Sequence, residues 1–123
     1  MNFTRAYIIV GIFGLLLLAS CGKQYQAKSL VKDYVKTYAV NPDGIDITSF
    51  STLDSTKVIG DSLIQVMRQR AKDDTMFKNN LQFTAEKKGN TLLYIRMRYG
   101  NDSLSMSKTF YFDADMTGIV AFK

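Results

Sequence analysis

The spacing of apolar residues predicts an amphipathic helix early in the chain. Over residues 27–39, apolar side chains recur at steps of one, three and four residues, and lysines occupy the opposite side. One face of a helix repeats at this interval, so the stretch is expected to be helical. The run Asn-Pro-Asp-Gly at 41–44 ends it, because proline cannot continue a helix and the run favours a turn.

A strand is predicted to follow this turn. Residues 45–53 are rich in β-branched side chains and begin with alternation of apolar and polar residues. The alternation breaks around residues 49–51, where a bulge or the end of the strand is expected. Residues 54–57 are expected to form a loop.

A second amphipathic helix is expected to begin at Asp61 or Ser62, since either residue can cap it, and to extend as far as Lys78. Its apolar positions follow helical spacing: Leu63, Ile64, Met67 and Ala71. The residues expected to face solvent are Arg68, Arg70, Lys72 and Asp73. An extended conformation of residues 63–67 is the alternative.

Alternation with a period of two indicates four strands in the last third of the chain. They are expected at residues 81–86, 93–99, 104–112 and 119–122. Gly89-Asn90, between the first two, is a typical hairpin pair. Lys108 is an exception on the otherwise apolar face of the third strand. Three successive hairpins of this kind form an antiparallel meander.

These elements predict an α+β domain in which one or two amphipathic helices pack on a four- to five-stranded antiparallel meander sheet. One face of the meander is apolar and must be covered, and the helices are the available cover. The order of elements resembles that of cystatin-like and nuclear-transport-factor-like rolls. It is also similar to that of short Bacteroidetes lipoproteins, which share a helix, an Asn-Pro-Asp turn and an aromatic-rich terminal meander.

The first part of the chain predicts export. Arg5 is followed by an uncharged apolar run over residues 6–18, which suits a signal peptide and is short of the length needed to span a bilayer. The next residues, Leu18-Ala19-Ser20-Cys21, resemble the bacterial lipobox. The resemblance implies cleavage between Ser20 and Cys21 and acyl chains on Cys21. The alternatives are an uncleaved membrane anchor, or an ordinary signal peptide beside an incidental cysteine.

The lipobox resemblance divides the chain into three parts. Residues 1–20 would be removed, residues 21–26 would form a lipidated tether, and residues 27–123 would form a single domain. Acyl chains hold a protein firmly on a membrane, so the membrane is the first expected partner. No aspartate and no acidic cluster follows Cys21 directly. We therefore expect a position on the outer membrane, facing the periplasm.

Composition argues against an enzyme. The chain has no histidine to activate a nucleophile, and its one cysteine is assigned to lipid. Asp73-Asp74 and the segment Asp113–Gly118 carry paired carboxylates, and the latter resembles the start of a calcium loop. No glutamate closes it at the twelfth position, so a plain turn is expected. No catalytic residue, metal or cofactor is predicted.

A basic and aromatic strand face raises the question of nucleic acid. Tyr94, Arg96 and Arg98 share one face of their strand, with Lys87 and Lys88 nearby in the sequence. A lipidated envelope protein rarely meets nucleic acid. The face is therefore expected to be solvated or to contact an acidic partner.

Four short motifs resemble the acceptor pattern of Bacteroidetes O-glycosylation, in which aspartate precedes serine or threonine. Their acceptor residues are Ser55, Ser62, Thr75 and Ser103, mostly in segments expected to be loops. Turn and cap chemistry is the alternative explanation, because the same pairs favour turns.

The preferred function is a small non-enzymatic envelope lipoprotein that binds a protein or peptide of the envelope. One alternative is a roll that binds a small ligand in a pocket between helix and sheet. The aromatic residues proposed to line it, which would otherwise simply be core, are Tyr34, Tyr38, Phe83, Tyr94 and Phe110. A further alternative is a hydrolase or a protease-inhibitor-like module, although the Gln-x-Val-x-Gly loop of cystatins is lacking.

Overall fold

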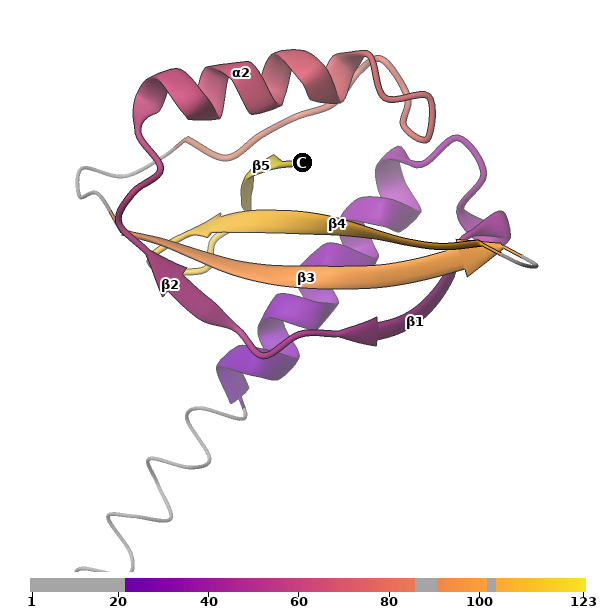
Figure 1. Cartoon of the computed structure of the whole chain (residues 1–123), viewed down its shortest axis with the longest axis horizontal. Helices are drawn as coiled ribbons and strands as arrows, with labels where there is room; N and C mark the ends of the chain where they lie inside the picture. Colours follow the sequence, from indigo (N-terminus) through magenta and orange to yellow (C-terminus); the bar gives the residue numbers. More distant parts are fainter. Residues whose placement is uncertain (1–21, 86–90, 102–103) are drawn as a thin grey trace, which may run out of the picture.

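A computed structural model describes residues 22–85, 91–101 and 104–123, and the statements below concern these residues. They form two helices packed against a five-stranded antiparallel sheet (Figure 1), which confirms the expected α+β class. An N-terminal helix covers residues 22–38. The later elements are the 3-10 turn η1 (Pro42–Gly44), β1 (Asp46–Phe50), β2 (Asp54–Thr56), α2 (Asp61–Lys72), β3 (Leu92–Asn101), β4 (Leu104–Asp113) and β5 (Ile119–Phe122).

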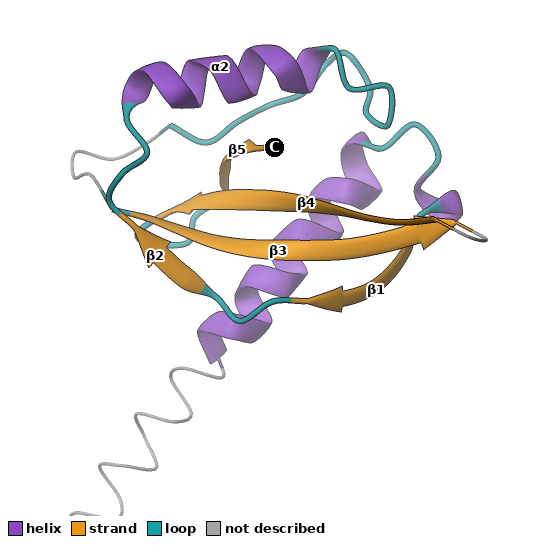
Figure 2. Cartoon of the chain, viewed as in Figure 1, coloured by secondary structure: helices purple, strands orange, loops and turns teal. Residues whose placement is uncertain are grey.

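The sheet is built around β3. Strands β3, β4 and β5 follow one another as antiparallel hairpins, as predicted. The other side of β3 is shared by β1, which pairs with its C-terminal half, and β2, which pairs with its N-terminal half (Figure 2). The expectation of a loop at residues 54–57 was therefore wrong. The register of β1 shifts between Ile47 and Ser49, beside the segment in which an irregularity was predicted.

Ser51 marks the point where this edge of the sheet is interrupted. Its backbone N–H donates to the carbonyl of Arg96, and its hydroxyl accepts the N–H of Arg96, both at 2.8 Å. After the end of β1, the Ser51 hydroxyl thus takes the place of the backbone carbonyl that would accept the Arg96 N–H in a continuous strand. Gln24 satisfies the loop that follows: its side chain donates to the Ser51 carbonyl at 2.9 Å and accepts the N–H of Leu53 at 2.6 Å.

The expected tether at residues 21–26 is contradicted over its described part. Residues 22–26 are helical and belong to the same helix as the predicted residues 27–38. Gln24 contacts the interrupted edge strand, Gln26 donates to the carbonyl of Met116 at 3.3 Å, and Ala27 is fully buried. The polar side chains of this turn form hydrogen bonds with the connection between β1 and β2 and with the connection between β4 and β5.

Apolar side chains are buried on both faces of the sheet. The N-terminal helix crosses one face and contributes Val31, Tyr34 and Val35 to the main core cluster (Figure 1). The strands supply its other half, including Ile95, Met97, Tyr99, Phe110, Phe112 and Phe122. A smaller cluster on the opposite face joins α2 to the sheet and contains Ile64, Met67, Leu92, Tyr111, Val120 and Ala121.

Helix α2 is shorter than expected. Ile64, Met67 and Ala71 are buried as predicted, whereas Leu63 is 42% exposed. The residue that precedes α2 is Gly60, so neither of the proposed side-chain caps acts there. The helix ends at Lys72 because the chain turns at Asp74, whose carboxylate accepts the N–H of Met76 at 3.0 Å.

The strand predicted at residues 81–86 does not form over its described part. Residues 81–85 have no strand pairing, because β1 and β2 occupy the place beside β3 that a hairpin would need. The segment lies instead against β5, where the N–H of Thr84 donates to Ile119 O at 2.8 Å. Leu81 and Phe83 still pack on the core, which accounts for their apolar alternation. The proposed Gly89-Asn90 turn lies outside the described residues.

Arg68 was expected to face solvent, and the structure contradicts this. Its guanidinium donates to the carbonyl of Val120 at 2.9 Å and to that of Thr84 at 3.0 Å, and it lies 5.4 Å from the Phe83 ring centre. Arg68 therefore satisfies a carbonyl on the outer side of β5. Such coverage keeps a sheet edge from pairing with another chain.

Candidate functional site

Two depressions lie near the two ends of the N-terminal helix, which is about 25 Å long. The first, here called the basal groove, has a volume of about 740 Å³. It is lined by Lys23, Gln24, Tyr25 and Lys28 of the helix, by residues 50–55, and by Leu93. The second, here called the distal pocket, has a volume of about 420 Å³. It is lined by Gly44, Ile45, Asp74, Thr75, Met76, Tyr99, Gly100, Met106 and Lys108.

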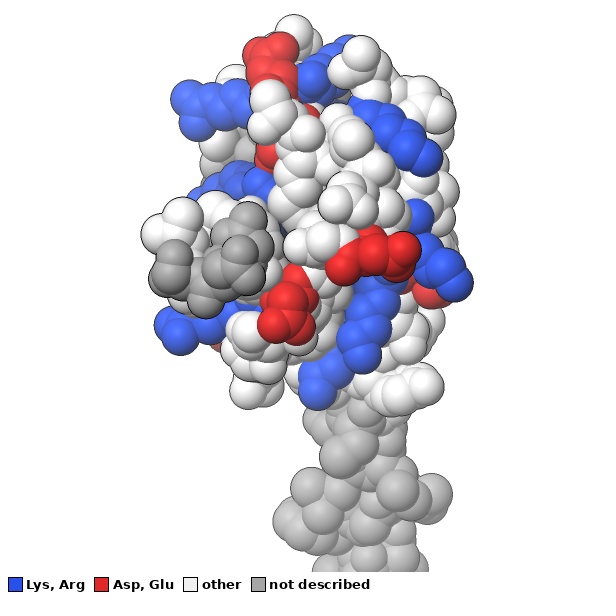
Figure 3. Space-filling model, turned by 90° about the vertical axis from the view of Figure 1, so that its right-hand side faces the viewer, with Lys and Arg blue, Asp and Glu red and all other residues white. Residues whose placement is uncertain are grey.

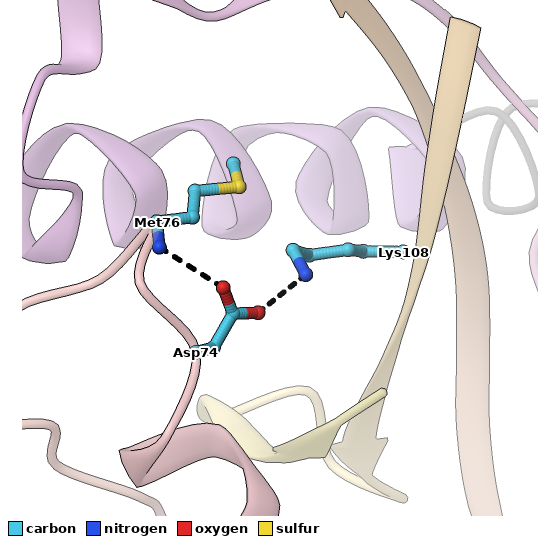
Figure 4. Close-up of polar contacts among 3 residues, drawn as sticks. All are labelled: Asp74, Met76 and Lys108. Atoms are coloured by element: carbon cyan, nitrogen blue, oxygen red, sulfur yellow. Dashed lines mark hydrogen bonds and ion pairs between the residues drawn. The ribbon is translucent and has the colours of Figure 1, made fainter.

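The distal pocket contains a partly buried ion pair (Figure 4). Lys108 reaches from β4 to Asp74, with Nζ and Oδ2 separated by 2.5 Å, and the two side chains are 13% and 23% exposed. The same ammonium lies 5.9 Å from the ring centres of Phe77 and Phe122. Lys108 thus stands on the apolar face of β4 because a carboxylate and two aromatic rings compensate its charge.

The remaining walls of the distal pocket are largely apolar and open. Met106 is 43% exposed, and Leu104, at the start of the same strand, is 65% exposed. A shallower cavity of about 260 Å³ adjoins the pocket through Gly44, Ile45, Thr75 and Met76 and adds the exposed Val40. Such a surface suits contact with a partner rather than a chemical step, because its one charged pair is already satisfied.

The ion pair can be tested by replacing Lys108 with methionine, which keeps an unbranched stem over the rings. We expect a loss of about 1–2 kcal/mol in the free energy of unfolding, because Asp74 is left partly buried without its counter-charge. A double-mutant cycle in urea with Asp74→Asn measures the coupling between the two side chains. Additive effects of the two substitutions would show that the pair contributes nothing.

The five aromatic residues proposed to line a ligand pocket do not share a cavity. Tyr34 and Phe110 are buried in the main cluster, Tyr38 and Phe83 pack against it, and Tyr94 belongs to the cluster on the other face. Ring centres of Tyr34 and its neighbours Tyr38, Phe83 and Phe110 are 4.6–6.3 Å apart. None of the three cavities described above is lined by these residues. Their packing favours the alternative in which they are core.

Tyr34 carries a hydroxyl group into this core. Its hydroxyl donates to the carbonyl of Gln82 at 3.1 Å. Burial, followed by the proximity of Tyr38, raises the pKa of Tyr34 well above its usual value near 10, although Arg68 opposes the shift. The tyrosine therefore stays neutral in the folded protein, and its contribution to stability falls as the pH rises above about 10, where the unfolded chain ionises.

The calcium-like segment is a structured turn, as the sequence indicated. Asp113 is 1% exposed, and its carboxylate accepts the N–H groups of Thr117 and Gly118, at 2.8 and 3.2 Å, and the Thr117 hydroxyl at 2.5 Å. These bonds use the carboxylate within the β4–β5 connection. Among the described residues no group of three or more acidic, histidine or cysteine side chains could hold a metal ion.

The proposed glycosylation sites fall in different settings. Ser55 lies in β2, although a loop was expected there, and Ser62 lies in the first turn of α2, at the start of the predicted helix; both are exposed. Thr75 is exposed in a turn at the rim of the distal pocket. Ser103 lies outside the described residues.

Charged side chains are dispersed over the face of the molecule that Figure 3 shows. On that face lysine and arginine alternate with acidic side chains and form no continuous basic stripe of the kind that follows a nucleic-acid backbone. On the sheet, Arg96 and Arg98 are exposed, as predicted, whereas Tyr94 is partly buried. Lys87 and Lys88 lie outside the described residues.

The ion pair between Lys108 and Asp74 was not expected from the sequence, although the lone cation on an apolar strand face was a signal for it.

Neither helix in the described ranges is long and apolar enough to cross a membrane. Searches of protein families, of curated proteins and of solved structures find no match to this chain.

Proposed function

We propose that this protein is a lipid-anchored, non-enzymatic binding module of the bacterial envelope, held by acyl chains on Cys21 at the outer membrane and facing the periplasm. The run Leu18-Ala19-Ser20-Cys21 carries the proposal. The chain is already helical one residue after Cys21. An anchor there holds the domain without a flexible spacer.

The two depressions then take different positions relative to the bilayer. The basal groove adjoins the anchor, and its Lys23, Lys28 and exposed Tyr25 suit the headgroup region of an anionic membrane. The distal pocket lies at the far end of the helix and is directed away from the membrane. It is the surface we propose for a periplasmic partner.

The anchor is tested by metabolic labelling with a fatty acid in a bacterial host that processes lipoproteins. We expect the wild-type chain to incorporate the label and to fractionate with the outer membrane. Cys21→Ser should abolish labelling and leave an unprocessed precursor. Ser20→Ala is the matched control, because it keeps a small residue before the cysteine and should be labelled normally. An unlabelled wild-type chain, or a labelled Cys21→Ser variant, would refute the anchor.

A further inference from the structure

In the part of the chain that the structure describes, one segment of sheet edge beside the distal pocket is unpaired. Strand β5 pairs with β4 only over Phe110–Phe112, and the last backbone pair joins Thr109 to Lys123. The N-terminal half of β4, Leu104–Lys108, is paired on its β3 side alone within the described part of the chain. The other edge of the sheet differs, because β1 and β2 interrupt it with a register shift and a break.

The direction of the free backbone groups follows from the ladder. The N–H and C=O of Thr109 both bond to Lys123, so they point away from β3. Backbone groups in a strand alternate with a period of two, so those of Ser107 and Ser105 point the same way. Both serines are exposed, and no hydrogen bond occupies these groups among the described residues. A strand laid here would continue the line of β5.

The two faces beside this edge differ in chemistry. On the helix-covered face stand Met106 and Lys108, which line the distal pocket. On the opposite face the register places Arg98 beside Ser107, and Arg96 beside Thr109, which is itself paired with Lys123. Arg96, Arg98 and Lys123 are exposed, and helix α2 leaves them uncovered because its contacts lie at the other end of this face.

We propose that the edge Ser105–Ser107 binds an extended peptide segment of a partner, added antiparallel to β4, in which acidic residues facing Arg96, Arg98 and Lys123 alternate with apolar residues facing the distal pocket. This inference rests on the proposed function for the setting in which the partner is met. Backbone hydrogen bonds supply affinity in such β-addition, and the alternating side chains supply specificity. The cationic face selects acidic residues by complementarity.

A second copy of this chain is the competing occupant of this edge. Antiparallel pairing of two β4 edges would keep the same face on the same side, but the two β3 strands that carry Arg98 would be about 14 Å apart, with both β4 strands between them. On this face a second copy would present Ser105, Ser107 and Thr109 rather than acidic residues, so it lacks the attraction that the arginines give an acidic peptide.

The test is titration of the full chain in detergent with a capped heptapeptide of alternating aspartate and valine. The amide signals of Ser105 and Ser107 should shift in nuclear magnetic resonance spectra of isotope-labelled protein. Calorimetry should give a dissociation constant, and the same peptide with lysine in place of aspartate should bind at least about tenfold more weakly.

Ser107→Pro removes one outward N–H and is compatible with an edge position, because that N–H takes no part in the β3–β4 ladder. We expect the aspartate–valine peptide to bind this variant at least about tenfold more weakly, whereas Ser107→Thr, which keeps the N–H, should bind normally. If the proline variant does not fold, the wild-type protein is titrated instead with the peptide methylated on its edge-facing amides, which should also bind at least about tenfold more weakly.

Several results would overturn the inference. One is an unchanged dissociation constant both for the Ser107→Pro variant and for the peptide methylated on its edge-facing amides. The others are unchanged amide signals at Ser105 and Ser107, and equal dissociation constants for the aspartate and lysine peptides. A dimer that is lost in Ser107→Pro, together with no peptide binding, would assign the edge to a second copy instead. A chain that is acylated but does not bind the peptide refutes this inference alone, and a chain that binds but is not acylated refutes only the anchor.

Discussion

Replacing Phe122 with alanine is expected to lower the free energy of unfolding by about 3–5 kcal/mol. Phe122 is 2% exposed, and its ring centre lies 4.7 Å from that of Phe77, 5.4 Å from that of Phe110 and 6.1 Å from that of Tyr34. Truncation removes ring contacts with the N-terminal helix, with β4 and with the segment after α2, and leaves a cavity that rigid strands cannot close. For a domain whose whole stability is about 5–15 kcal/mol, the loss is large.

Urea denaturation followed by circular dichroism measures this effect. Leu63→Ala is the matched control, because Leu63 is also a large apolar residue in a regular element but is 42% exposed. We expect the control to lose less than about 1 kcal/mol. Equal losses in the two variants would show that the aromatic cluster is not the centre of the core.

Asp113→Ala is expected to destabilise the protein by about 2–4 kcal/mol. The substitution deprives the N–H groups of Thr117 and Gly118 of their acceptor in the β4–β5 connection. The same connection holds Met116 at a φ of 57°, a left-handed conformation that costs a non-glycine residue about 1–2 kcal/mol. The hydrogen bonds of Asp113 and the burial of the Met116 side chain offset that cost.

Asp113→Asn is the control for this prediction. Its side-chain oxygen can still accept the two N–H groups, so we expect less than half of the loss seen with alanine. Hydrogen exchange at Thr117 and Gly118 should become faster in the alanine variant and change little in the asparagine variant. Similar stability of the two variants would mean that the carboxylate contributes through something other than these bonds.

The same turn explains one failed prediction. Gly118 has no room for a side chain, because a Cβ there would collide with the hydroxyl of Thr84. The segment 81–85 is thus packed directly on the β4–β5 connection. Alternation at Leu81 and Phe83 correctly indicated that these residues face the core. It could not indicate whether the backbone pairs with β3, because burial of alternate side chains is the same with or without a ladder.

The candidate surfaces were less accessible to sequence reasoning than the fold. The alternative hypothesis of a ligand pocket lined by aromatic residues competes with one in which these residues are core, and Tyr34 and Phe110 are buried in the core. The distal pocket is lined instead by residues from four separate segments, including Asp74, Tyr99 and Lys108. No spacing in the sequence relates these segments. Only Lys108, a charge on an apolar strand face, was visible as an exception.

The sequence by itself determined the α+β class, the apolar side of the N-terminal helix, the β3–β4–β5 hairpins and the turn at Asp113. These are properties of neighbouring residues, whose periodicity and turn chemistry act over a few positions. Tertiary structure alone decided that β1 and β2 share one side of β3, that residues 22–26 are helical, and that, among the described residues, the N-terminal half of β4 has no strand on its outer side. These depend on which of several compatible segments gives the lowest free energy beside a strand, and that comparison involves residues distant in the sequence, which local periodicity does not encode.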